Sequence, residues 1–212
     1  MALPADSSRD RLLLRSGRFA EWLGDRAHGG TGGATWPPDG KGTRVKFKTA
    51  YLHCGEYLRQ TLANPIEEIE SAISAVEWKS DFEFTEGGSA YSHQAGYNKA
   101  LAREFADRGW ERQPKLRGEP RLIGDFRKGL VFVEVQFGNS SALYRDYYKF
   151  QYGLSQGLLS LAVLIVPAEP ARFFPGRPES VQNMAEFGLA RTCFEVLPIN
   201  VPTLLIGLLP EN

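Results

Sequence analysis

The segment LVFVEVQF, residues Leu130 to Phe137, decides the fold of this chain. It consists of β-branched and aromatic residues except at Leu130, Glu134 and Gln136, and this composition predicts a strand. Because side chains alternate faces along a strand, Glu134 and Gln136 point one way while the neighbouring apolar residues point the other way into a core. A carboxylate in such a strand is costly unless it is paired or binds a metal ion. Glu134 is therefore the first candidate for a functional residue.

The sequence downstream of this strand predicts a strand–helix–strand unit. Apolar residues recur every three or four positions from about Ser140 to Gly157, which is typical of a helix. The apolar run LSLAVLIVP, residues 159–167, then predicts a buried strand. Two strands joined by a helix form a parallel pair with a right-handed crossover.

Upstream, Asn64, Pro65 and Glu67 have the order of a helix start, with a capping side chain, a proline in the first turn and a following glutamate. A second helix is expected from about Gly96 to Arg108. Near the end of the chain, Cys193 to Leu197 and Thr203 to Leu208 are predicted to be further strands. The expected fold class is α/β, with a mixed central β-sheet flanked by helices on both faces.

The N-terminal 50 residues differ from the rest. A short basic helix is expected over residues 9–23, followed by a Gly/Pro-rich linker over residues 28–42. We therefore divide the chain into an N-terminal arm, residues 1–50, and a domain spanning residues 51–212. The net charge is zero, but eight basic and five acidic residues lie between Arg103 and Lys128. A local basic face there would be enough to bind nucleic acid, and the more common alternative is an ordinary solvated surface. The longest apolar run is too short to cross a bilayer, and we expect a cytoplasmic protein with no membrane partner.

Asp125 lies nine residues before Glu134 and just ahead of a Lys128-Gly129 turn signal. A hairpin at that turn would bring the two carboxylates together in an oxygen-rich site of the kind that Mg²⁺ takes, with the main-chain carbonyl near Val135 as a further ligand. Such a site suits phosphodiester hydrolysis, because a metal ion stabilises the extra negative charge and lowers the pKa of a bound water. The residues alone leave a second interpretation open, in which Glu134 and Gln136 simply face water from a half-exposed strand.

Asp125 and the segment EVQFGN, residues 134–139, resemble the active-site segment of the BglII/BstYI restriction endonucleases, which belong to the PD-(D/E)XK nuclease superfamily. The resemblance extends over about residues 51–210, and the following helix is similar to that of the related BamHI group. It implies that Asp125 and Glu134 are the metal-binding catalytic carboxylates. Gln136 would stand where most of the superfamily carries lysine. A neutral amide cannot take a proton, so the general base stays open.

The same resemblance implies residues that contact DNA. Asn139 would contact a base, since an amide offers both a donor and an acceptor to a base edge. Ser140 and Ser141, at the start of the following helix, are expected either to cap it or to bind bases and phosphates. Two basic residues, Arg145 and Lys149, share its polar face and are candidates for phosphate or base contacts, with a solvated face as the alternative.

The loop over residues 172–183 is similar to the recognition loop of the BamHI group, in which an Asp-Arg pair reads an outer base pair. Here the pair is Gly176-Arg177. Arg177 can still read guanine with two hydrogen bonds. Because the aspartate is missing, the identity of the outer base pair stays open.

The resemblance implies a type II restriction endonuclease that cuts double-stranded DNA with Mg²⁺ and is accompanied by a cognate DNA methyltransferase. A two-fold homodimer would recognise a palindrome, for which the family suggests six base pairs with a GATC core. The alternatives are a structure-specific repair nuclease and an inactive DNA-binding module on the same fold. A metabolic α/β protein is disfavoured, because the sequence has no phosphate loop or nucleotide fingerprint.

Overall fold

The computed structural model describes residues 43–118 and 121–210. The helix expected at residues 9–23 and the linker expected at residues 28–42 lie outside this part of the chain. A compact unit spans Gly40–Asn212. Its first strand begins at Thr43, so residues 43–50 belong to the sheet, although the sequence assigns them to the N-terminal arm.

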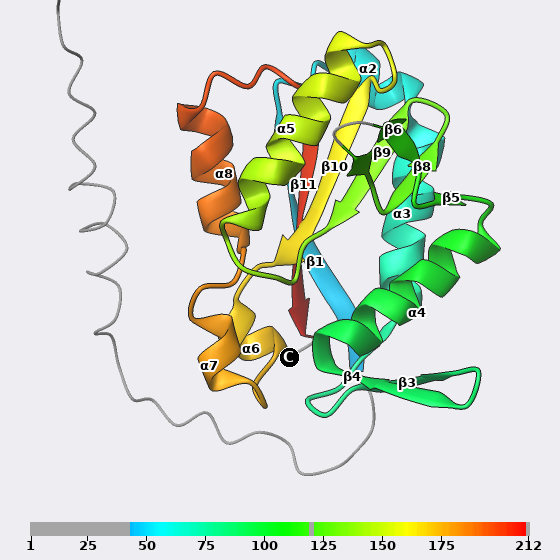
Figure 1. Ribbon diagram of the computed structural model, residues 1–212, viewed down its shortest axis with the longest axis vertical. Helices are drawn as coiled ribbons and strands as arrows, with labels where there is room; N and C mark the ends of the chain where they lie inside the picture. Colours follow the sequence, from blue (N-terminus) through cyan, green and yellow to red (C-terminus); the bar gives the residue numbers. More distant parts are fainter. Residues whose placement is uncertain (1–42, 119–120, 211–212) are drawn as a thin grey trace, which may run out of the picture. The chain divides into compact units, whose positions relative to one another are not determined.

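A seven-stranded sheet forms the centre of the described unit (Figure 1). The strands lie in the order β2-β1-β11-β10-β9-β8-β5, where β1 is Thr43–Leu52, β2 Glu77–Trp78, β5 Glu111–Arg112, β8 Phe126–Lys128, β9 Val131–Val135, β10 Leu161–Pro167 and β11 Thr203–Pro210. Strands β9, β10 and β11 are parallel, whereas β1, β2, β8 and β5 pair antiparallel with their neighbours. The predicted mixed sheet and the parallel strand pair around one helix are therefore confirmed.

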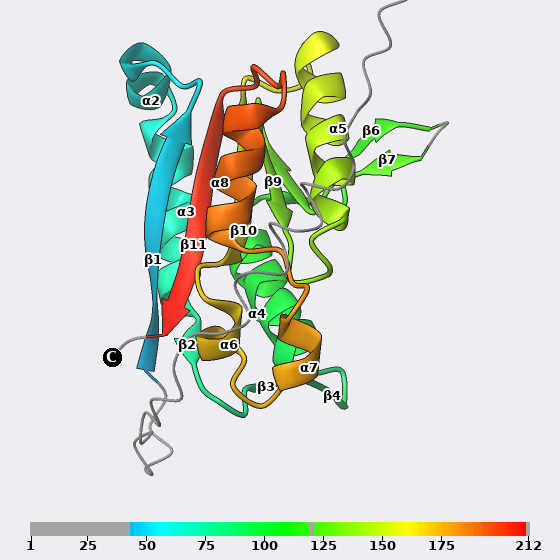
Figure 2. The same ribbon diagram turned by 90° about the vertical axis from the view of Figure 1, so that its left-hand side faces the viewer.

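Helices cover both faces of the sheet, as Figures 1 and 2 show. One layer contains α3 (Ala63–Ala75) and α4 (His93–Asp107), and the other contains α5 (Ala142–Ser155) and α8 (Phe187–Val196). The smaller elements are the helices α2 (Glu56–Thr61), α6 (Pro170–Phe173) and α7 (Pro178–Val181), and the hairpins β3–β4 (Glu83–Glu86, Ser89–Ser92) and β6–β7 (Lys115–Arg117, Leu122–Ile123). None of the helices in residues 43–118 and 121–210 has the length and apolar character needed to cross a membrane.

Alternation along β9 divides the core into two layers. Val131 and Val133 pack with the buried residues of α3 and α4, while Phe132 packs with the layer of α5 and α8. Glu134 has the same parity as Phe132 and therefore faces α5. The two-residue period predicted from the sequence thus places a carboxylate against the inner face of a helix.

Two local predictions need correction. The segment Cys193 to Leu197 is the end of helix α8 rather than a strand. Its apolar residues fit a strand locally, but Phe187, Ala190 and Phe194 recur at helical spacing and bury one face of the helix against the sheet. Helix α3 begins at Ala63 with no side-chain cap, so Asn64 lies in its first turn. The strand predicted from Thr203 is confirmed.

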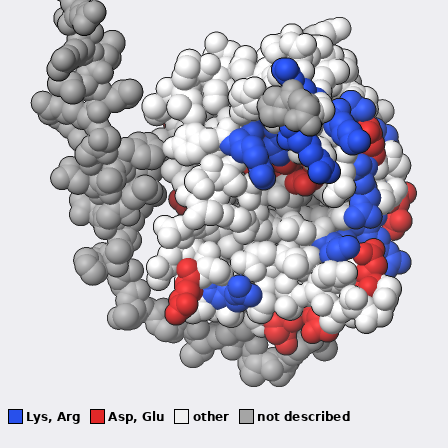
Figure 3. Space-filling view, viewed as in Figure 1, with Lys and Arg blue, Asp and Glu red and all other residues white. Residues whose placement is uncertain are grey.

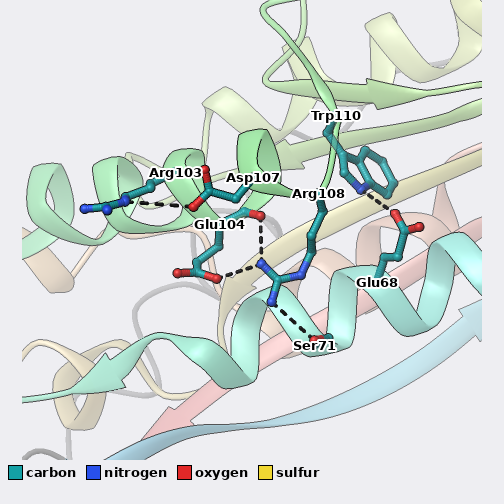
Figure 4. Close-up of polar contacts among 7 residues, drawn as sticks. All are labelled: Glu68, Ser71, Arg103, Glu104, Asp107, Arg108 and Trp110. Atoms are coloured by element: carbon teal, nitrogen blue, oxygen red, sulfur yellow. Dashed lines mark hydrogen bonds and ion pairs between the residues drawn. The ribbon is translucent and has the colours of Figure 1, made fainter.

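A polar cluster joins α3 to the end of α4, as Figure 4 shows, and Lys128 adds β8 to it. Arg108 donates hydrogen bonds to Glu104 and, across the two helices, to Ser71 at 3.3 Å. Glu68 on α3 accepts hydrogen bonds from the Trp110 indole at 3.0 Å and from Lys128 at 2.7 Å. We call these six residues, Glu68, Ser71, Glu104, Arg108, Trp110 and Lys128, the helix clamp. The clamp links α3 to the end of α4 at the edge of the core, to which Trp110 belongs.

Candidate active site

The β8–β9 hairpin brings the two predicted carboxylates together. Phe126 pairs with Val133 in antiparallel register, and Asp125 and Glu134 are the residues that directly adjoin this last pair. Gly129 makes the turn with φ +58°, a conformation that glycine adopts without strain. The Asp125 carboxylate accepts a hydrogen bond of 2.8 Å from the Val135 N–H, beside Glu134. The predicted meeting of the two acidic residues at this hairpin therefore has a geometric basis.

Glu134 lies in a buried cluster with two residues of α5. Its side chain is 5% exposed, and its Oε1 lies 2.6 Å from the Lys149 ammonium. Lys149 also lies 2.9 Å from Asp146, which is completely buried. Asp146 was not a candidate from sequence. We call Asp125, Glu134, Asp146 and Lys149 the acid–lysine centre.

The charges of this centre perturb one another. Burial raises the pKa of Glu134 well above its usual value, the negative charge of Asp125 raises it further, and Lys149 opposes both. Burial also raises the pKa of Asp125, against the lowering effect of the Val135 N–H. Burial by itself would lower the pKa of Lys149, but the carboxylates of Glu134 and Asp146 raise it. The charged forms of Asp125 and Glu134 are thus disfavoured in this space, and a bound cation would favour them.

The residues present fit a divalent metal ion. No group of three or more acidic, histidine or cysteine side chains is arranged as a metal site within residues 43–118 and 121–210. Asp125 and Glu134 would instead supply two carboxylates. The Val135 carbonyl points to the same side of the strand as its N–H, which faces Asp125, and offers a third oxygen. Mg²⁺ commonly binds to one or two carboxylates and keeps several waters, so a set of this size suits it.

Gln136 is held by two hydrogen bonds. Its Nε2 donates to Asp146 at 2.8 Å, and its Oε1 accepts from the Gly138 N–H at 2.9 Å. Gln136 thus adjoins the predicted site, and its amide connects α5 to the chain just before Asn139.

Asn139 is exposed at the end of the loop that follows β9. Its Oδ1 accepts a hydrogen bond of 2.8 Å from the Ser141 N–H, which satisfies a donor at the start of α5. Ser141 occupies the N-cap position, but its side chain makes no capping bond, and Ser140 is half-buried. The capping expected of the serines is therefore performed by Asn139.

The two basic residues predicted on α5 differ in position. Arg145 is exposed, as expected for the polar face of the helix. The placement of Lys149 on that face is wrong, because its side chain is only 4% exposed and points to Glu134 and Asp146. Lys149 directly precedes the buried Phe150 in the helix. The sequence signal for its burial was Asp146, three residues earlier, which is close enough on a helix to form an ion pair with it.

The segment after β10 contacts the segment after β9. The Ser140 N–H donates to the Asn183 carbonyl at 2.7 Å, and the Ala185 N–H donates to the Gly138 carbonyl at 2.9 Å. Arg177, at the start of α7 in the same segment, is exposed. Because β9 and β10 are adjacent and parallel, both segments leave the sheet at the carboxyl ends of its strands, where α/β folds commonly bind ligands.

A cavity of about 390 Å³ opens beside Asp125. Its lining includes four polar side chains that the sequence did not single out as a group, namely Asn98, Lys99, Arg112 and Gln113. Arg112 is exposed. Figure 3 shows Lys and Arg side chains gathered over the part of the molecule that contains α4, β5 and β8. The basic excess between residues 103 and 128 was the signal for this surface.

Comparison with known proteins gives a consistent result. A family model described as restriction endonuclease BglII/BglIII matches residues 47–208, which is more than half of the chain. A search of curated proteins finds no match. The chain is similar to the crystal structure of restriction endonuclease BglII complexed with a DNA 16-mer, with a TM-score of 0.62 and 16% sequence identity, over 78% of this chain and 77% of that chain. At this identity the structural likeness concerns the fold.

Proposed function

Because this chain belongs to the restriction endonuclease BglII/BglIII family, we propose that it is a type II enzyme that cuts both strands of DNA at a short palindrome with Mg²⁺. The observation that carries the proposal is the hydrogen bond from the Val135 N–H to the Asp125 carboxylate, which holds Asp125 beside Glu134 at the end of the β8–β9 hairpin. Two carboxylates and a main-chain carbonyl at one point form the oxygen-rich site that phosphodiester hydrolysis requires.

Each group of the site has a role that its chemistry allows. Asp125 and Glu134 would hold the ion, and Val135 would contribute its carbonyl. When bound, Mg²⁺ stabilises negative charge on the phosphate and makes water a better nucleophile near neutral pH. Lys149 balances part of the negative charge next to Glu134, and Gln136 positions its neighbours without taking a proton. Two basic residues of the adjoining cavity, Lys99 and Arg112, attract the DNA backbone towards Asp125.

Base recognition would come from the segments after β9 and β10. Asn139 is exposed beside the centre, and its side-chain NH₂ group can donate to a base edge while its Oδ1 holds the helix start. Ser140, Ser141 and Arg145 follow on the same segment and can contact phosphates or bases. Arg177 would reach an outer base pair from the neighbouring segment.

The partner in solution would be a second copy of the chain, because a two-fold dimer matches the symmetry of a palindrome. Helix α5 exposes Tyr144 and Tyr148, which are 48% and 52% exposed and lie one turn apart. Exposed aromatic residues of this kind are enriched at protein interfaces. A GATC core within six base pairs and a cognate methyltransferase complete the proposal, and light scattering tests the dimer.

Digestion of a mapped plasmid with Mg²⁺ tests the function, with EDTA as the control and sequencing of the ends as the readout. Discrete double-strand breaks at one palindrome are expected only with Mg²⁺. Cleavage of branched DNA alone would instead indicate a repair nuclease. No cleavage of any DNA, by protein that still binds it, would indicate an inactive DNA-binding module.

A further inference from the structure

A buried chain of polar contacts runs from the acid–lysine centre to the loop that carries Asn139. Asp146 is its middle member. One carboxylate oxygen lies 2.9 Å from the Lys149 ammonium, which in turn lies 2.6 Å from Glu134. The other oxygen accepts the hydrogen bond from the Gln136 amide at 2.8 Å. Asp146 therefore contacts both the neighbour of a proposed metal ligand and a residue of the recognition segment.

The orientation of the Gln136 amide follows from its two partners. The Gly138 N–H can only donate, so the amide oxygen must face it, and the NH₂ group is left to donate to Asp146. A methyl group on Gly138 would come within 2.8 Å of that oxygen, which shows how closely the amide packs on this loop. Asn139 follows directly. A shift of Asn139 would therefore also shift Gln136 and, through its hydrogen bond to Asp146, the position of Lys149.

Burial makes these contacts hard to replace. Asp146 is completely buried, and within the described part of the chain its Oδ1 accepts no hydrogen bond besides its ion pair with Lys149. Oε1 of Glu134 is likewise buried and has Lys149 as its polar neighbour. A buried polar group that loses its partner is left without a hydrogen bond or ion pair, which is costly. The residues joined by these contacts are therefore expected to move together.

We propose that Asp146 is a positioning residue that couples base recognition at Asn139 to the arrangement of Glu134 in the catalytic centre. The proposal rests on the proposed function and deepens it. Asp146 holds Lys149 against Glu134 with one oxygen and fixes Gln136, and thereby the loop before Asn139, with the other. Preference for the correct sequence and correct placement of the catalytic carboxylate then depend on the same side chain.

The test compares binding of two duplexes in Ca²⁺, one with the palindrome mapped by plasmid digestion and one with it scrambled, and checks afterwards that both are intact. In Asp146→Asn an amide replaces the carboxylate, and its single oxygen cannot accept from both Lys149 and Gln136, because its NH₂ group only donates. We expect the ratio of specific to non-specific affinity to fall roughly 10- to 100-fold, the effect of losing a hydrogen bond to a charged group.

Tyr147→Phe is the matched control. Tyr147 neighbours Asp146 on α5 and is also buried, but its hydroxyl donates to the Ala190 carbonyl on α8, outside the chain of contacts. Its loss should lower the melting temperature slightly and leave the affinity ratio unchanged. An equal fall of the ratio in Tyr147→Phe would show that any loosening of α5 suffices, and the coupling role of Asp146 would be overturned.

Gln136→Met provides a second way to interrupt this series of polar contacts, since it removes both hydrogen bonds of the amide and leaves the Asp146–Lys149 ion pair in place. It should lower the ratio as Asp146→Asn does, and the double variant should lose no more than either single variant. If Asp146→Asn does not fold, the affinity ratio of Gln136→Met alone tests the coupling. A wild-type ratio in a folded variant overturns the coupling but not the proposed function, whereas a wild-type protein with no sequence preference overturns both.

Discussion

The helix clamp and the acid–lysine centre are both built from carboxylates and cationic side chains, yet their glutamates are perturbed in opposite directions. The pKa of Glu68 is lowered, first by the hydrogen bond from Lys128. The pKa of Glu134 is raised, first by burial and then by the charge of Asp125. The Glu68–Lys128 pair is about one-third exposed, whereas the Glu134–Lys149 pair is almost completely buried.

The opposite pKa shifts indicate that the helix clamp stabilises the fold, whereas the acid–lysine centre is a strained group of charges that the rest of the fold must stabilise. In the clamp, water and several donors compensate the carboxylate, so its charge stabilises the native state modestly. In the centre, burial disfavours the charged forms of Asp125 and Glu134, and a bound cation would offset this effect. Perturbed groups of this kind gather at functional sites.

The largest expected effect is on cleavage. Asp125→Ala and Glu134→Ala should each lower the rate of plasmid cutting by about 10³-fold or more, because the metal ion they would hold supplies several kcal/mol of transition-state stabilisation. DNA binding should change little. Glu68→Gln in the clamp is the control and should cut normally. Normal cutting by either alanine variant would remove the assigned site.

Recognition should depend on Asn139 and not on the clamp. Asn139→Ala should weaken specific binding by roughly 1–3 kcal/mol, the value of one good base contact, with non-specific binding nearly unchanged. Fluorescence anisotropy with mapped and scrambled duplexes measures both affinities. Because Asn139 also holds the start of α5, Asn139→Asp serves as a second variant that keeps the accepting oxygen and loses the donor. An unchanged ratio in both variants would refute the base contact.

Stability should respond to pH with opposite signs in the two regions. The folded pKa of Asp125 is raised, so its charge destabilises the metal-free protein once the pH exceeds that pKa. Asp125→Asn should therefore raise the melting temperature at pH 7–8 by roughly 2–4 °C for each kcal/mol of unfolding free energy gained. The gain should shrink as the pH falls through the raised pKa and vanish below the unfolded-state pKa. Added Mg²⁺ should stabilise the wild type but not this variant. Scanning calorimetry across pH checks both statements.

For Glu68 the lowered pKa means that its contribution is present above the unfolded-state pKa and is lost as the pH falls through the folded one. Glu68→Gln should therefore lower the melting temperature at pH 7 and have no effect at strongly acidic pH. A gain in stability at pH 7 would contradict the contrast between the two clusters.

The smallest effect is expected for Arg108→Ala. Its side chain is about one-quarter exposed and bonds to Glu104 and Ser71, so the loss should be about 0.5–1 kcal/mol of unfolding free energy. Chemical denaturation measures the change, and cleavage should be unaffected. Loss of cleavage in a folded Arg108→Ala protein would show that the clamp also belongs to the functional surface.

Much of the fold and the hairpin could be predicted because the signals are local. A two-residue period identifies β9 and puts Glu134 on one face, and a glycine turn brings Asp125 opposite it. A strand, a helix and a second strand in succession can form a parallel pair with only one usual handedness. These features depend on backbone sterics and on the pattern of apolar residues close together in the sequence, so a short segment is enough to predict them.

Contacts between distant elements could not be predicted in this way. Local composition favoured a strand at Cys193–Leu197, but burial of one face against the sheet made it the end of α8. The four-residue spacing of Arg145 and Lys149 predicted that both lie on the solvent-exposed face of the helix. The packing of α5 against β9 instead buries Lys149 against Glu134. Which charges are buried together, and hence which pKa values shift, depends on the packing of whole elements, and only the tertiary structure decided it.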